Sequence, residues 1–144
     1  MNILTLIALL AGSNWSTTCV MTQANGLQGY TIDSAVFTKG TADATSTLNV
    51  SLTRVWYKDQ NCTDVNGEKS AQSGTVTIGN PIDTMTFPGS VPEDILAADW
   101  NLGEQVTQLG AIAVAKDGKS IRTVTNSFGS SRNTMLSLFR YFAK

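Results

Sequence analysis

Short β-prone segments separated by turn residues recur along most of this 144-residue chain, and they constrain its fold more than any other feature. From Ser46 to Tyr57, apolar residues fall mainly at every second position. A period of two is typical of a strand with one face against a core. Turn signals such as Gly79-Asn80-Pro81 and Asp117-Gly118 follow such segments. We therefore predict an all-β fold, an antiparallel barrel of about eight strands, with a β-sandwich as the alternative.

The expected strands cover residues 14–21, 30–39, 46–57, 70–78, 84–87, 107–115, 120–126 and 134–142. Together they make a single barrel domain over residues 14–144, a length that suits one hydrophobic core. Pro92 and the two acidic residues after it suit the first turn of a helix, because the helix dipole favours negative charge there. Residues 92–100 are therefore predicted as a short helix, with a loop as the alternative.

The segment from Ile3 to Ala11 is apolar apart from Thr5. A helix over this segment would rise about 13 Å, too little for a bilayer core of about 30 Å. The length suits the apolar region of a secretory signal, and Ala11-Gly12-Ser13 offers small residues for cleavage, although no Lys or Arg precedes the run. We expect residues 1–13 to act as a signal peptide, cleaved or uncleaved, and the protein to be exported to the periplasm, cell surface or medium. The alternative is a buried first strand or helix.

The composition excludes several function classes. The chain has no histidine, which removes Ser-His-Asp and Cys-His catalysis and the commonest zinc ligand. The formal net charge of -1 argues against nucleic acid as a partner. We expect no enzymatic activity, no cofactor and no metal. Two cysteines in an exported chain most simply form one disulfide, Cys19 with Cys62, since a redox or metal role lacks CxxC spacing and a neighbouring histidine.

A family resemblance rests on Trp15, Cys19, the segment from Trp56 to Cys62 and the segment from Ser73 to Gly79. This pattern resembles small exported bacterial lipocalin-like proteins and the APCDD1-type extracellular domain, which share a Trp-x-x-x-Cys opening and a Tyr-x-Asp-x-x-Cys turn. The resemblance implies a cup-shaped barrel that holds an apolar small molecule. It also implies that the disulfide joins the first strand to the turn after the third, and that Asp59 caps this turn and orients Cys62.

Two groups of side chains are candidates for specific roles. Arg54 is in register with apolar residues of its strand, so it points either into the barrel or, after a bulge, into water. If inside, it suits a ligand with a carboxylate or phosphate head. The ligand-binding candidates are Arg54, Trp56, Leu52 and Val50. The barrel-closing candidates are Trp15 with Arg140 or Arg122, as a cation–π stack across the barrel floor.

Three hypotheses for function follow. The first is a monomeric, non-catalytic exported binding protein that holds an apolar or amphipathic small molecule, which predicts an internal apolar cavity of several hundred Å³, as is usual for such sites. The alternative is a protein-interaction module such as a small-barrel protease inhibitor, with residues 14–18 as a projecting segment after signal cleavage. The third, an outer-membrane barrel, lacks the aromatic girdles expected at lipid interfaces, so we do not expect an integral membrane protein.

Overall fold

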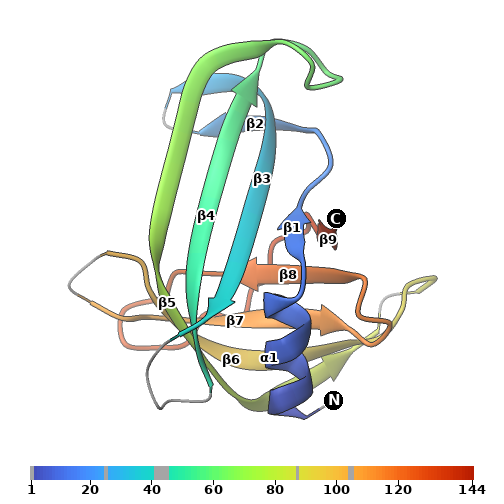
Figure 1. Ribbon diagram of the computed structural model, residues 1–144, viewed down its shortest axis with the longest axis vertical. Helices are drawn as coiled ribbons and strands as arrows, with labels where there is room; N and C mark the ends of the chain where they lie inside the picture. Colours follow the sequence, from blue (N-terminus) through green and yellow to red (C-terminus); the bar gives the residue numbers. More distant parts are fainter. Residues whose placement is uncertain (1, 25, 41–45, 87, 104–105) are drawn as a thin grey trace.

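Nine antiparallel strands and one helix make up the part of the chain that the computed structural model describes, residues 2–24, 26–40, 46–86, 88–103 and 106–144. The elements are α1 (Ile3–Ala11), β1 (Asn14–Ser16), β2 (Val20–Ala24), β3 (Leu27–Lys39), β4 (Thr47–Tyr57), β5 (Val65–Met85), β6 (Glu93–Asn101), β7 (Gln108–Ala115), β8 (Ser120–Val124) and β9 (Tyr141–Ala143). They form one sheet in the order β1-β9-β8-β7-β6-β5-β4-β3-β2. An additional pairing of β1 with β3 closes eight of them into a barrel and leaves β2 as an extra strand (Figure 1). The predicted eight-stranded barrel is confirmed.

The barrel closes through the short strand β1. Trp15 lies opposite Ala35 of β3 and also opposite Ala143 of β9. Further along the chain, β2 pairs with the first part of β3, with Val20 opposite Thr31. The long strands β3, β4 and β5 extend beyond the barrel at the end where β2 lies, whereas α1 lies at the opposite end (Figure 1). We call the first end the mouth and the second end the base.

The barrel interior is apolar at the base and polar toward the mouth. Along the inner face of β4, Leu48 and Val50 are buried in the main hydrophobic core, whereas Leu52 and Arg54 are partly exposed. The same core takes in Trp15 and side chains of α1. Alternation along the strand therefore places a charged group on the inner face only where the barrel opens to water.

Residues 3–11 form a helix that belongs to this core. The side chains of Leu6, Ile7 and Leu10 are buried, and α1 packs against β3 and β5. The indole N–H of Trp15 donates a hydrogen bond of 3.1 Å to the carbonyl of Leu10. The structure thus has the buried first helix that was the alternative for this segment, while signal-peptide function stays a prediction. No helix among the described residues has the length and apolar character needed to cross a membrane.

The helix predicted over residues 92–100 is wrong, because this segment is strand β6. It hydrogen-bonds β5 on one side and β7 on the other. Leu96, Ala98 and Trp100 are buried in the main core at every second position, which is strand periodicity. The two-sided pairing outweighs the local preference that Pro92 gives for a helix start.

Further boundaries differ from the prediction. The strand expected at 14–21 is divided into β1 and β2, with residues 17–19 between them. The strands expected at 70–78 and 84–87 belong to one strand, β5, which passes Gly79-Asn80-Pro81 through register shifts between Ile78 and Asp83; Phe87 lies outside the described residues. In the tail predicted as a strand over 134–142, only β9 pairs. The segment before β9 covers the outer face of β6, β7 and β8, where Leu136 packs against a second core cluster of Ile95, Ala111, Ala113 and Val124.

Candidate functional site

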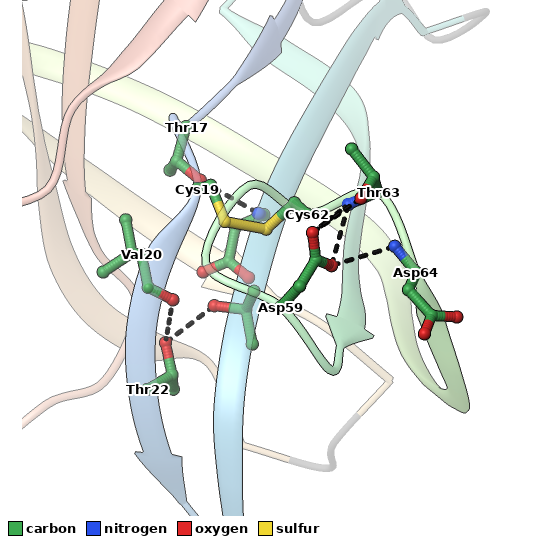
Figure 2. The surroundings of a disulfide bond; sticks show 10 residues. Thr17, Cys19, Val20, Thr22, Asp59, Cys62, Thr63 and Asp64 are labelled. Carbon is green, nitrogen blue, oxygen red and sulfur yellow. Dashed lines mark hydrogen bonds between the residues drawn. A yellow bond between two sulfur atoms is a disulfide. The ribbon is translucent and has the colours of Figure 1, made fainter.

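The predicted disulfide is confirmed, and it joins the start of β2 to the turn between β4 and β5. Cys19 and Cys62 are bonded, with 5.8 Å between their Cα atoms. Figure 2 shows this bond between the chain that enters β2 and a turn held by Asp59. The Asp59 carboxylate accepts hydrogen bonds from the backbone N–H groups of Thr63 and Asp64 and from the Thr63 hydroxyl. Asp59 thus has the turn-capping role that the resemblance implied.

The hydrogen bonds to Asp59 change its titration. They favour the ionised carboxylate, above all the bond from the Thr63 hydroxyl, and they lower the pKa of Asp59 from 3.8 to about 2. Cys62 has a positive φ of 51°, a conformation that non-glycine residues adopt at a cost and that the surrounding turn must hold. The capped turn and the disulfide together fix the β4–β5 hairpin, and Arg54 lies on the first of its two strands.

Arg54 lies on the inner face of the barrel near the mouth and forms a bidentate ion pair with Asp33 of β3. Its Nε and Nη2 donate to the two carboxylate oxygens at 2.7 and 2.9 Å. The two residues are directly opposite in the β3–β4 register. About a third of the Arg54 side chain is exposed. The bonds to Asp33 raise the pKa of Arg54 above its ordinary value, so the guanidinium remains charged.

Trp56 supports the same guanidinium. The Arg54 Cζ lies 5.9 Å from the centre of the Trp56 ring, within cation–π range. The ion pair uses two of the five N–H groups of Arg54. Among the described residues, no acceptor bonds the Nη1 group, so three N–H groups can donate to a bound molecule. Asp33 and Trp56 thus orient the Arg54 guanidinium and leave three of its N–H groups available as donors.

A cavity of about 380 Å³ lies beside Arg54 at the mouth. Hydroxyl and amide side chains from the opposite walls of the barrel line it together with Leu52. The polar lining residues are Asp33, Thr53, Arg54, Ser70, Gln72, Thr123, Thr125 and Tyr141. Burial, and secondarily the charge of Asp33, raises the pKa of Tyr141 to about 12. The Tyr141 hydroxyl is therefore a neutral donor at physiological pH.

A second hollow of about 210 Å³ shares Arg54 and Asp33 with the first. Its walls include apolar side chains from β2 and from the chain before β9, namely Val20, Met21 and Phe139. Met21 is 68% exposed and Phe139 is 52% exposed. The ion pair therefore has a polar cavity on one side and a partly apolar rim on the other.

The candidates named from the sequence divide between this site and the core. Leu52 and Arg54 line the cavity, and Trp56 supports Arg54. Val50 is buried in the apolar core and does not line the cavity. The sequence reasoning missed Asp33 and Tyr141. Asp33 lies on β3 and Tyr141 on β9, and only the strand pairing brings them to the same cavity as Arg54.

The predicted stack of Trp15 with Arg140 or Arg122 is not what the structure shows. Trp15 is fully buried inside the barrel and donates to Leu10. Arg122 lies on the opposite face of β8 from the core residue Ile121, and both arginines bind Glu93, at 2.9 and 3.0 Å. A buried carboxylate requires paired charges. The Glu93 carboxylate on the outer face of the sheet therefore binds both guanidinium groups there.

No group of three or more His, Cys, Asp or Glu residues in the described part of the chain is arranged to hold a metal ion. A comparison with protein-family models, with curated proteins and with solved structures found no match to this chain. The geometry of the mouth is therefore the feature that indicates a function.

Proposed function

We propose that this is a non-catalytic, exported binding protein that holds an amphipathic small molecule at the barrel mouth, with the polar head of that molecule on Arg54. The observation that carries the proposal is the cavity of about 380 Å³ beside an arginine whose Nη1 has no acceptor among the described residues. Binding sites for small molecules commonly enclose about 300–1,000 Å³. The cavity is therefore large enough for a small ligand.

The surrounding groups favour an oxygen-rich head. A carboxylate or phosphate can accept from Arg54 Nη1 and from the Tyr141 hydroxyl, and charge-assisted bonds of this kind are the stronger ones. Asp33 already neutralises much of the arginine charge and holds the guanidinium plane. The apolar part of the ligand then lies against Leu52 or the rim formed by Met21 and Phe139.

The cavity at the mouth has a mostly polar lining, whereas the ligand-binding hypothesis predicted an internal apolar cavity. The apolar half of the interior is filled by the core side chains of the strands and by Leu6, Ile7 and Leu10 of α1. The open space lies among polar groups instead. This distribution favours a short amphipathic ligand over a large apolar one.

Isothermal titration calorimetry with decanoate tests the proposal. Decanol and decyltrimethylammonium are the comparison probes, because they have the same ten-carbon chain with an uncharged or a cationic head group. We expect decanoate to bind more tightly than both, and Arg54→Gln to weaken decanoate by about tenfold, which corresponds to the loss of one charge-assisted bond. Arg132→Gln is the matched control, because it removes a similarly exposed ion pair, with Asp99 on the outer face. Equal binding of decanoate by the two variants would refute the proposal.

The protein-interaction alternative predicted a projecting segment at residues 14–18. Trp15, Ser16 and Thr17 are buried, so this segment does not project while residues 1–13 are present. Export is supported by the disulfide, which is typical of oxidising compartments. The intact mass of protein recovered after export, compared with that of the full chain, tests whether residues 1–13 are removed.

A further inference from the structure

We propose that the base of the barrel is a second binding site, for an uncharged apolar chain that carries a carbonyl group, and that α1 occupies this site in the full chain. This site is separate from the polar cavity at the mouth. It goes beyond the proposed function, because its ligand needs no charged head.

The helix has the character of a bound apolar molecule. Every side chain of Ile3–Ala11 is apolar except Thr5, and its first and last turns carry no charged residue. Leu6, Ile7 and Leu10 are almost completely inaccessible, whereas Leu4 is 68% exposed. One face of α1 is thus inserted among core residues such as Phe37 and Leu48. Apolar burial has no directional requirement, so another apolar chain of similar width can pack against the same core side chains.

One hydrogen bond is the reason for expecting a carbonyl group on the ligand. The indole N–H of Trp15 donates to the backbone carbonyl of Leu10, and Trp15 is fully buried. If α1 leaves, this donor loses its acceptor inside an apolar environment, which is costly. A ligand that supplies an ester or amide carbonyl at this position restores the bond, whereas a plain hydrocarbon does not.

Removal or displacement of α1 would open the site. Residues 1–13 are the segment whose sequence predicts a secretory signal, and no disulfide or ion pair among the described residues holds α1 to the barrel. Loss or displacement of this segment removes three buried side chains from the core, while the barrel strands and the Cys19–Cys62 bond lie outside the removed residues. The vacated space is then lined by the apolar residues that α1 now covers.

Substitutions in the full chain test this site. Leu10→Asp places a charge in the apolar base and expels the helix face, because an unpaired charge is strongly disfavoured there. Leu4→Asp adds the same charge to the exposed face of α1 and is the matched control. The probe is N-phenyl-1-naphthylamine, whose fluorescence rises in apolar surroundings. We expect L10D to bind it about tenfold more tightly than L4D or the unchanged chain.

The identity of the ligand is tested by displacement. Methyl octanoate should displace the probe from L10D more effectively than octane, and Trp15→Phe in the L10D chain should remove this difference. Arg54→Gln in the L10D chain should leave probe binding unchanged, which separates the base from the mouth. A loss of probe binding on Arg54→Gln would place the probe at the mouth and overturn the assignment, as would equal binding by folded L10D and L4D.

Hydrogen exchange of the unchanged chain gives a second test that does not depend on the folding of L10D. If methyl octanoate replaces α1, the amides of residues 3–11 exchange faster as the ester is added, while those of β4 do not. Unchanged exchange of residues 3–11 at an ester concentration that displaces the probe from the unchanged chain would overturn the proposal.

Discussion

Replacing Leu10 with alanine measures how much α1 contributes to the stability of the barrel. Leu10 is fully buried and belongs to the same core as Trp15 and Leu48. Truncation of a buried leucine costs about 2–5 kcal/mol, whereas leucine and alanine differ little in helix propensity. We therefore expect L10A to lower the free energy of unfolding by about 3 kcal/mol, a large share of the roughly 5–15 kcal/mol that stabilises a domain.

Urea unfolding followed by tryptophan fluorescence measures this change, on protein whose mass shows that residues 1–13 are present. Leu4→Ala is the matched control, because Leu4 lies on the same helix with 68% of its side chain exposed. Such surface substitutions usually change stability by no more than about 0.5 kcal/mol. If L10A and L4A unfold at the same urea concentration, α1 is not docked in the core and the reasoning is refuted.

Three further perturbations test other parts of the fold. The wild type should melt at a higher temperature than Asp59→Asn. This difference in melting temperature should be complete above about pH 4 and disappear as the pH falls through about 2, because the folded-state pKa of Asp59 is lowered to about 2. A difference in melting temperature that stays constant across this pH range would contradict the capping role. Reduction of Cys19–Cys62, which closes 43 residues, should lower the unfolding free energy by about 4 kcal/mol in urea titrations, and a loss below about 1 kcal/mol would contradict the chain-entropy argument. Glu93→Gln, which leaves two arginine side chains poorly paired, should cost about 3–5 kcal/mol by the same assay, and a neutral effect would show that water compensates the charges.

The fold class was predictable because strand periodicity is local. The alternation from Ser46 to Tyr57 indicates β4 without any knowledge of its neighbours. The prediction of a helix at residues 92–100 was wrong because the acidic residue after Pro92 has a different role. Glu93 follows Pro92 as an acid in a helix start would, but in the structure its carboxylate binds Arg122 and Arg140 across the outer face. A short segment cannot show whether an acid serves a helix dipole or a distant arginine.

The candidate site was predictable only in part. Alternation along β4 puts Arg54 on the same face as Leu52 and Trp56, and the structure keeps it there. Its partner Asp33 depends on the register in which β3 pairs with β4. Tyr141 comes to the same cavity from the far end of the chain through β9. These contacts depend on pairings that no spacing in a single sequence specifies.

The closing seam of the barrel has a consequence for the order of folding. Strand β1 joins β3 through Asn14–Ser16 and joins β9 through only two residue pairs, one of them between Trp15 and Ala143. The two pairs with β9 connect the two ends of the described chain, and contacts of such long sequence separation form slowly. A chain that leaves the ribosome or crosses a membrane from its N-terminus can form the hairpins of β3, β4 and β5 early, yet it remains an open sheet with an exposed apolar face until residue 143 arrives.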